Sequence, residues 1–324
     1  MTLTLATPSH LRPPQVRRFD INRDLNSVAN LIEQCFAATL DADGRRYIRQ
    51  MRSSARNPRF LRWAANLADM DSMPMAGFVW EEDDHLVGNL SMIRAKNAAH
   101  RTYLIANVAV HPDYRRRGIA KALTKAALRH AQDQHAYSIW LHVREDNQAA
   151  VDLYTSMQFA ERARRTTWRS FTPSRPQENA EELRVLPRLS QHWSLQSDWL
   201  DEMYPQSLRW YLPLTLKEIR PGFFGALSRL FAPTQYRHWS ALRGQSLTGV
   251  LTWQKTYGAT DRLWLATSPR NEASALLALL PHARQHLSTV RPLDLDYPAH
   301  QAAEIFSQLG FRNQQTLIWM QYKP

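Results

Sequence analysis

The sequence contains one pattern twice, and this internal repeat restricts the possible folds more than any other feature. Residues 141–159 (LHVREDNQAAVDLYTSMQF) align without a gap on residues 293–311 (LDLDYPAHQAAEIFSQLGF), because both ends are offset by 152 positions. Upstream, HLVGNL and SLTGVL place Gly88 opposite Gly249. The apolar positions coincide: Leu141 with Leu293, Val143 with Leu295, Ala150 with Ala302, Leu153 with Ile305, and Phe159 with Phe311. A recurring pattern of this length predicts two copies of one fold.

The first copy alternates strand patterns with helix patterns. Hydrophobic periodicity predicts strands at 16–19, 103–110 and 137–143, a hairpin over 76–95, and helices over 24–36, 45–66, 118–132 and 147–157. We expect Asp24 to cap the first helix and Glu81–Asp84 to form a solvated acidic turn. Alternating strands and helices predict an α/β fold in which each copy is a mixed β-sheet flanked by helices.

The segments outside the two copies are short. Residues 1–15 are predicted to be a loose tail. Residues 171–182 (FTPSRPQENAEE) hold two prolines and little apolar content, which is typical of a linker. We therefore expect domains at 16–170 and 183–324.

The stretch VAVHPDYRRRGIAKAL (108–123) places three arginines and a glycine where a predicted strand gives way to a predicted helix. A helix N-terminus presents unpaired N–H groups and the positive end of the helix dipole, so it binds phosphate readily. Gly118 allows a positive φ or the close approach of a ligand, and arginine side chains suit phosphate oxygens. The stretch therefore predicts a pyrophosphate cradle, with a turn that carries a solvated basic face as the alternative.

The second copy lacks this stretch. Pro112 corresponds to Pro269, but Leu141 follows Pro112 by 29 positions (141 − 112) and Leu293 follows Pro269 by only 24 (293 − 269). No glycine replaces Gly118 in the second copy.

Two polar side chains are lost at the same time. At the offset of 152, Asn147 is replaced by Ala299 and Tyr154 by Phe306, while the apolar positions remain. This difference indicates a ligand site in the first copy and a degenerate scaffold in the second.

These residues resemble the acetyl-CoA loop of the GNAT N-acetyltransferase superfamily. The family pattern, Gln/Arg-x-x-Gly-x-Gly/Ala, corresponds to RRRGIA at 115–120, and residues 141–159 resemble the strand and helix that follow it. The resemblance covers about 16–168, and a degenerate copy covers about 183–322. It implies two tandem GNAT-like domains, each a twisted mixed β-sheet flanked by helices, with acetyl-CoA as the acetyl donor and no metal.

The resemblance also implies where acetyl-CoA would lie. Two central strands, here 103–110 and 137–143, splay apart and take the pantetheine arm, while the loop N–H groups take the pyrophosphate. The cofactor-binding residues implied in this way are Val108, Ala109, Val110, Arg115, Arg116, Arg117, Gly118, Ile119, Ala120, Lys121, Asn147 and Tyr154. The sequence departs from the family at Gln158, where a glycine is usual and where the second copy keeps Gly310; we expect only a different turn there.

Tyr154 is our candidate for the general acid, because the family's tyrosine at this position often lies close to the thioester sulfur; the alternative is a tyrosine that only packs on the sheet. Asn147 either bonds the pantetheine or caps its helix.

WLHVR at 140–144 resembles the WLEVR of ribosomal-protein N-terminal acetyltransferases, in which a glutamate occupies the position of His142. His142 is therefore our candidate for the general base, with a polar residue on an exposed sheet face as the alternative. Weaker base candidates are His111, Glu81 and Glu82.

Composition limits the partner and the compartment. The formal net charge of +12 favours acidic ligands, but the arginines are scattered and no long basic block points to nucleic acid. The single cysteine, Cys35, excludes an intrachain disulfide and a thiolate metal cluster. Residues 1–18 lack a signal-peptide pattern, and the longest apolar run, ALLALL at 275–280, is too short for a bilayer, so we expect a cytoplasmic protein with no membrane partner.

The sequence thus predicts an acetyl-CoA-dependent N-acetyltransferase that moves an acetyl group to a primary amine by direct attack, with its active site in the N-terminal copy. The alternative is a non-catalytic acyl-CoA-binding regulatory or scaffold protein, and a nucleic-acid-binding protein is a third, weaker hypothesis. The acceptor is a small-molecule or peptide amine, and the aromatic segment 192–213 either lines its pocket or packs as an amphipathic helix. We expect a monomer whose copies form a pseudo-dimer, with a homodimer as the alternative.

Overall fold

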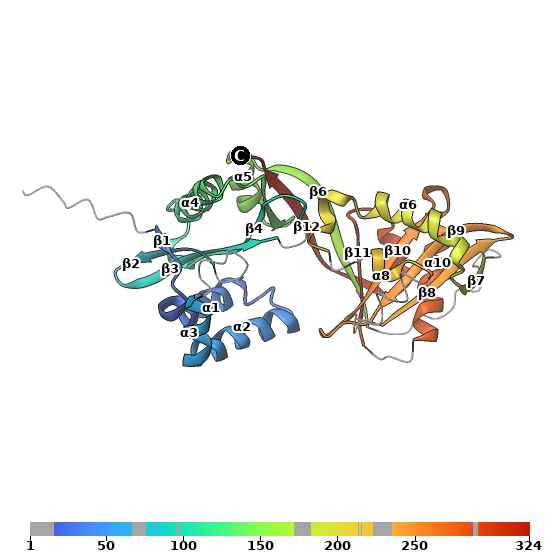
Figure 1. Ribbon diagram of the computed structural model, residues 1–324, viewed down its shortest axis with the longest axis horizontal. Coiled ribbons are helices and arrows are strands. Elements are labelled where there is room, and N and C mark those ends of the chain that lie inside the picture. Colours follow the sequence, from blue (N-terminus) through green and yellow to red (C-terminus); the bar gives the residue numbers. More distant parts are fainter. Residues whose placement is uncertain are drawn as a thin grey trace, which may run out of the picture. The chain divides into compact units, whose positions relative to one another are not determined.

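Figure 1 shows the protein as a computed structural model. Its contacts divide the chain into two compact units: one runs to Leu141 and includes Tyr322–Pro324, and the other spans His142–Gln321. The structure describes residues 16–66, 76–95, 98–171, 183–212, 214, 216–222, 235–287 and 291–324. The predicted tail, and all but the first residue of the predicted linker, lie outside these ranges. The domain limits of 16–170 and 183–324 stay a prediction.

The first unit is built on a mixed sheet with the order β1-β2-β3-β4-β5. Neighbouring strands are antiparallel, except β4 and β5, which pair in parallel. The strands are β1 (Val16–Arg18), β2 (Ala76–Glu82), β3 (His85–Arg94), β4 (Thr102–Val110) and β5 (Ser138–Arg144). The predicted strands and hairpin of the first copy are therefore confirmed.

Helices cover both faces of this sheet (Figure 1). They are α1 (Ile21–Phe36), α2 (Ala42–Ala55) and α3 (Pro58–Asn66) on one face and α4 (Ile119–Asp133) on the other. The prediction of one helix over 45–66 is wrong, because the helical conformation is interrupted between α2 and α3. Asn57 accepts hydrogen bonds from the N–H groups of Arg59 and Phe60, each at 3.1 Å, and a residue that precedes proline disfavours the helical conformation.

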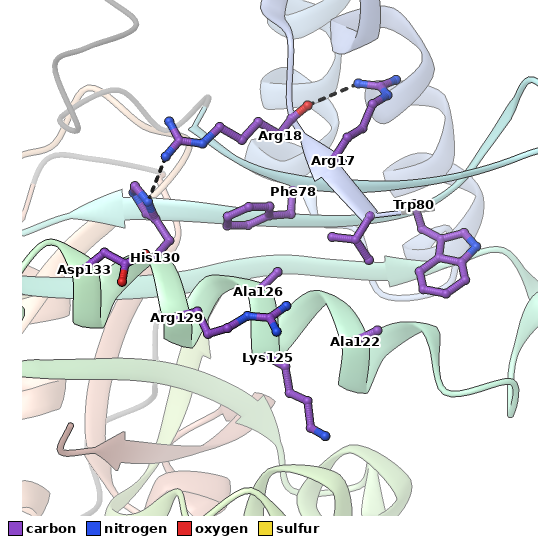
Figure 2. Close-up of a pocket in the computed structure, with 11 residues that line it drawn as sticks. Arg17, Arg18, Phe78, Trp80, Ala122, Lys125, Ala126, Arg129, His130 and Asp133 are labelled. Carbon is purple, nitrogen blue, oxygen red and sulfur yellow. Dashed lines mark hydrogen bonds between the residues drawn. The ribbon is translucent and has the colours of Figure 1, made fainter. Parts of the chain in front are cut away.

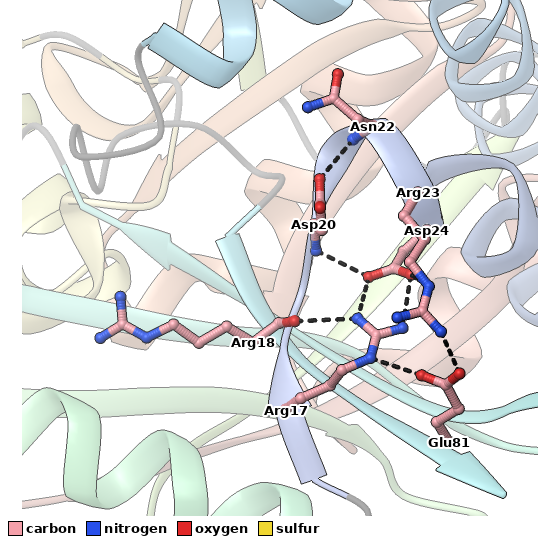
Figure 3. A network of polar contacts seen from close by, with 7 residues as sticks. All are labelled: Arg17, Arg18, Asp20, Asn22, Arg23, Asp24 and Glu81. Atoms are coloured by element: carbon pink, nitrogen blue, oxygen red, sulfur yellow. Dashed lines mark hydrogen bonds and ion pairs between the residues drawn. The ribbon is translucent and has the colours of Figure 1, made fainter. Parts of the chain in front are cut away.

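The predicted cap of α1 is also wrong. Asp20, not Asp24, is the N-cap, and its side chain accepts a hydrogen bond from the N–H of Asn22 at 2.9 Å. Asp24 is buried instead and binds the guanidinium of Arg17 at 2.6 and 2.8 Å (Figure 3). The sequence places a carboxylate at both positions, and only the long-range partner Arg17 separates the two roles.

The prediction that Glu81–Asp84 forms a solvated acidic turn is wrong for Glu81 (Figure 3). Glu81 lies in β2, where it accepts a hydrogen bond from Arg17 at 2.7 Å and is paired with Arg23. The turn consists of Asp83 and Asp84, whose φ angles of 50° and 60° match the two positive φ values of a tight hairpin turn. The ion pairs therefore join β1, β2 and the start of α1.

The second unit repeats this arrangement. Its strands β7 (Leu183–Pro187), β8 (Tyr236–Arg243), β9 (Ser246–Gln254), β10 (Asp261–Thr267) and β11 (Leu293–Pro298) follow the same order as β1 to β5. Again only the last pair, β10 and β11, is parallel. α10 (Glu272–His286) joins that pair as α4 joins β4 to β5. The duplication predicted from the sequence repeat is therefore confirmed by the topology.

The aromatic segment 192–213 forms α6 (Trp193–Met203) and α7 (Gln206–Arg209), which precede α8 (Leu216–Ile219). Leu200, Tyr204 and Leu208 are buried, so the segment packs its apolar side chains as the helical alternative predicted. None of the described helices is long and apolar enough to cross a membrane.

The end of the first sequence copy belongs to the second unit. α5 (Gln148–Ser156) leads into β6 (Ala160–Ser170), which lies between β11 and β12 (Phe311–Tyr322) and is antiparallel to both. α11 (Ala303–Gln308) precedes β12. A strand of the first copy therefore completes the sheet of the second unit, and the compact units do not coincide with the sequence repeat.

Two equivalent glycines let a helix pack closely on each sheet. A Cβ atom at Gly88 would lie 2.8 Å from Cγ2 of Ile119 in α4, and a Cβ atom at Gly249 would lie 3.0 Å from Cβ of Ala275 in α10. Carbon atoms do not pack this closely, so a side chain at either position would push the helix away from the sheet.

The buried ion pair of Figure 3 provides a test of the first unit. Asp24→Asn should lower the free energy of unfolding by about 2 kcal/mol, because the Arg17 guanidinium loses the more buried of its two charged partners. Asp20→Asn should change it by less than about 0.5 kcal/mol, because asparagine caps a helix as well as aspartate does. Urea denaturation of both variants measures the difference, and equal losses would contradict the assignment of the two carboxylates.

Candidate active site

The predicted cradle is an irregular loop between β4 and α4. A 3₁₀ turn (Pro112–Tyr114) leads into the loop 115–118, and α4 begins at Ile119. Arg116 and Gly118 both have left-handed backbone conformations, with φ of 65° and 79°. In the second unit the equivalent 3₁₀ turn (Pro269–Asn271) runs directly into α10 at Glu272, so the loop is missing where the sequence comparison predicted the deletion.

The loop presents a run of free backbone donors. Within the described part of the chain, none of the N–H groups from Arg116 to Lys121 donates a hydrogen bond, whereas the N–H of Ala122 donates to the carbonyl oxygen of Gly118 at 2.9 Å. A Cβ atom at Gly118 would have no other atom within 4 Å. Open space in front of successive N–H groups at a helix N-terminus fits a phosphate group.

The three arginines differ in their contacts. Arg115 donates from Nε to the carbonyl oxygen of Val110 at 3.2 Å, and Arg117 donates to Glu82 at 2.6 Å while its guanidinium lies 5.1 Å from the ring of Tyr114. Arg116 is exposed, and no described residue accepts a hydrogen bond from its side chain. Arg115 and Arg117 therefore brace the loop, and Arg116 is available to a ligand.

Two contacts that the sequence did not predict shape this region. The thiol of Cys35 donates to the carbonyl oxygen of Val110 at 3.2 Å, and burial raises the pKa of this thiol although nearby Arg115 opposes the shift. Glu82 holds Arg117, whereas the sequence offered Glu82 only as a weaker base candidate. Both contacts join residues far apart in the sequence, so no local pattern could have revealed them.

The strand that carries Val108 to Val110 has an irregular backbone. β4 and β5 pair from Thr102 with Ser138 to Ile105 with Leu141, and no further pair is registered among the described residues although β4 continues to Val110. The register of β4 against β3 shifts before Ala109, and Asn107 has φ of 51°. Buried Asn89 donates to the carbonyl oxygen of Asn107 at 2.9 Å and holds this bulge, a role that the sequence did not predict. β4 and β5 therefore stop pairing before β4 ends, as expected for two strands that splay apart.

The remaining predicted residues lie in the second unit. Asn147 is exposed and caps α5, accepting a hydrogen bond from the N–H of Ala150 at 3.2 Å, so its capping role is confirmed and its contact with pantetheine stays a prediction. Tyr154 lies on the buried face of α5, and its ring packs edge-on against Phe159 at 5.8 Å. Burial raises the pKa of the Tyr154 phenol, so it keeps its proton at neutral pH.

His142 lies among aromatic rings of the same unit. The imidazole lies 4.1 Å from the ring of Trp319 and 4.5 Å from the ring of Tyr211, centroid to centroid, and its Nε2 atom is buried with no hydrogen-bond partner among the described residues. Burial lowers the pKa of His142 to about 4. The alternative of an exposed sheet face is therefore wrong, and the role of base stays a prediction.

The weaker base candidates all have partners. Glu81 and Glu82 are held in ion pairs with Arg17, Arg23 and Arg117. His111 contacts the amide of Gln34 at 3.0 Å. The predicted site residues thus divide into the loop and β4 of the first unit, and Asn147, Tyr154 and His142 of the second.

Comparisons with known proteins match the region that holds this loop. The family model described as "Acetyltransferase (GNAT) family" matches residues 31–159. The ribosomal protein bS18-alanine N-acetyltransferase of Escherichia coli (strain K12) is 36% identical over 69 residues, which cover 21% of this chain and 47% of that protein. Mycothiol acetyltransferase of Paenarthrobacter aurescens (strain TC1) is 44% identical over 52 residues, 16% of each protein. The chain thus spans less than half the length of these curated relatives.

Solved structures match almost the whole chain. A GCN5-related N-acetyltransferase from Sphaerobacter thermophilus has a TM-score of 0.57 at 13% identity, with 96% of both chains covered. A GCN5-related glucosamine N-acetyltransferase region of a fungal multi-domain GH3 β-N-acetylglucosaminidase has a TM-score of 0.59 at 13% identity, covering 96% of this chain and 38% of that one. At such identities the likeness concerns the fold, and with the repeated topology it confirms the predicted class of two tandem GNAT-like domains. The chain therefore carries, in residues 31–159, a domain of the GNAT acetyltransferase family.

Proposed function

We propose that this protein is an N-acetyltransferase whose N-terminal copy binds acetyl-CoA and moves the acetyl group to a primary amine by direct attack. The observation that carries the proposal is the run of free N–H groups from Arg116 to Lys121, in front of open space at Gly118. The second copy lacks the whole loop while keeping the surrounding fold. This contrast supports a ligand-binding role, because the same fold in the second copy exists without the loop and without the open space in front of its N–H groups.

The chain's own groups would hold the donor at three places. The N–H groups of 116–121 would bind the pyrophosphate, and the guanidinium of Arg116 would add charge. Val108, Ala109 and Val110 lie on β4 beyond its pairing with β5, where backbone groups can bind an amide-containing arm. Acetyl-CoA would supply an acetyl thioester, which is reactive toward amines.

The proposal also assigns the two proton transfers of the reaction, one from the attacking amine and one to the departing sulfur. An alkyl amine has a pKa near 10.4 and must lose a proton before it can attack. The Oη atom of Tyr154 would hold the proton for the departing sulfur, and its raised pKa keeps that proton in place. His142 is neutral and its Nε2 has no hydrogen-bond partner among the described residues, so it can accept a proton, although its lowered pKa makes it a weak base.

The acceptor is proposed as a class. The names of the relatives contain an alanine of ribosomal protein bS18 and mycothiol, that is, a protein residue and a small molecule. We propose a primary amine of a peptide or of a small molecule as the acceptor. The cytoplasmic location and the monomeric state stay predictions.

Acetyl-CoA binding tests the cradle directly. Gly118→Trp should weaken binding at least about 50-fold in calorimetric titration, because an indole would fill the space in front of the N–H groups. Gly244→Trp is the matched control, since Gly244 also has a positive φ and open space around its Cβ position but lies in the second copy. Wild-type affinity in Gly118→Trp, or no binding to the wild type, would contradict the proposed cradle.

The role of Tyr154 is tested by removing one hydroxyl. Tyr154→Phe should lower kcat about 100-fold or more and leave acetyl-CoA affinity within threefold, since general acid catalysis contributes about that much. Tyr137→Phe, at an exposed tyrosine, should leave kcat unchanged. Because the phenol keeps its proton above its ordinary pKa, the wild-type rate should not fall between pH 8 and about 10. Binding of acetyl-CoA without acetylation of any amine in a broad panel would favour the non-catalytic alternative.

The burial of His142 predicts a pH dependence of stability. Between pH 6.5 and about 4 the unfolded chain binds a proton at this imidazole and the folded chain does not, so stability falls as the pH falls. His142→Phe should flatten this dependence by up to about 1.4 kcal/mol per pH unit. Urea denaturation at pH 7, 6 and 5 measures it, with exposed His85→Gln as the control. An unchanged slope in His142→Phe would show that the imidazole is solvated.

A further inference from the structure

The first unit contains a groove of about 670 Å³ that the proposed acetyl transfer does not use. Figure 2 shows it between α4 and the strands β1 and β2. From α4 it is lined by Ala122, Lys125, Ala126, Arg129, His130 and Asp133, which recur every three or four residues and so share one helical face. The pyrophosphate loop lies before the first residue of this helix, so the groove is a separate feature of the same element.

Three cationic side chains lie along the groove. Lys125 and Arg129 are exposed on α4, and no described residue accepts a hydrogen bond from their side chains. Arg18 of β1 is exposed and donates to Nδ1 of His130 at 3.2 Å, which holds its guanidinium beside the groove (Figure 2). Arg17 lines the groove as well, but its guanidinium is already bound to Asp24 and Glu81. Arg18, Lys125 and Arg129 are therefore the charges that a ligand can meet.

The floor between these cations is apolar. Phe78 and Trp80 of β2 lie opposite the small side chains of Ala122 and Ala126. The ring of His130 packs edge-on against Phe78 at 6.0 Å, so the wall is held by ring contacts. Rings and methyl groups offer a surface for an apolar side chain, while the cations flank it.

The groove also borders an open sheet edge. Among the described strands, β1 pairs only with β2 and ends the sheet. Lys125 and Arg129 are four helical residues apart, which is about 6 Å along the axis. Alternate residues of an extended chain project to one side at a spacing of about 6.6 Å. Acidic side chains at alternate positions of an extended peptide therefore match the cations of α4.

We propose that this groove binds an extended acidic segment of a partner protein, with carboxylates on Lys125, Arg129 and Arg18 and an apolar side chain on Phe78 and Trp80. Charge complementarity and the open edge of β1 support this occupant. A single-stranded nucleic acid would meet the carboxylate of Asp133 at the end of the groove, and its phosphates would be repelled there. A peptide can place a neutral or basic residue at that end. This inference does not depend on the acetyltransferase proposal.

Fluorescence anisotropy with two labelled probes tests the groove. The probes are a ten-residue peptide of alternating glutamate and threonine with one central phenylalanine, and a ten-nucleotide single-stranded oligo(dT). We expect the full chain to bind the peptide at 50 mM salt, with at least fivefold weaker binding at 200 mM salt. Lys125→Glu/Arg129→Glu should weaken peptide binding at least tenfold, and Phe78→Ala at least threefold.

The matched control is Arg270→Glu/Arg312→Glu, which makes the same change of net charge at exposed positions of the second unit. It should leave peptide affinity within twofold, and circular dichroism melting checks that all variants remain folded. No peptide binding to the wild type, or an equal loss in the control, would overturn the proposal. Oligonucleotide binding that depends on Lys125 and Arg129 without peptide binding would also overturn it, in favour of a nucleic-acid site.

Discussion

The close contact between α4 and β3 at Gly88 is the packing on which the candidate site depends. Because Gly88 has no side chain, Ile119 and Leu123 lie directly on the strand, and the first turn of the helix is fixed against the sheet. The N–H groups of 116–121 therefore have a defined position even though they have no partner of their own among the described residues. A helix held less closely would present the same donors in varying positions, which weakens the binding of an anion.

The second copy keeps this packing and has lost the loop. Gly249 lets α10 approach its sheet as Gly88 lets α4 approach, so the scaffold does not depend on the ligand. Glu272, in the first turn of α10, accepts a hydrogen bond from the phenol of Tyr297. Phe306, which replaces the tyrosine of the first copy, stacks on Trp168 with ring centroids 5.0 Å apart. The second copy thus fills the position of the tyrosine with an aromatic contact and has no loop like that of the first copy.

The basic side chains behind the net charge of +12 have three different roles. Arg17 and Arg169 are bound to Asp24 and Asp294 and hold strands and helices together. Others brace the loop, as Arg117 does through Glu82. A third group, including Arg116, Lys125 and Arg129, is exposed and donates to no described residue. This third group and Arg18 are the basic side chains that the two proposed sites use, which is why net charge alone did not identify a partner.

The sequence by itself determined the duplication, most of the strands and helices of the first copy, and the loop at 115–120, because these depend on periodicity and spacing along the chain. The tertiary structure decided what depends on distant partners. Arg17 turned Asp24 from a predicted cap into a buried ion-pair partner, and the rings of Trp319 and Tyr211 enclosed His142 and lowered its pKa. Strand β6 joined the sheet of the second unit. Local pattern specifies which element a residue belongs to, whereas burial and charge pairing arise only when elements far apart in the sequence meet.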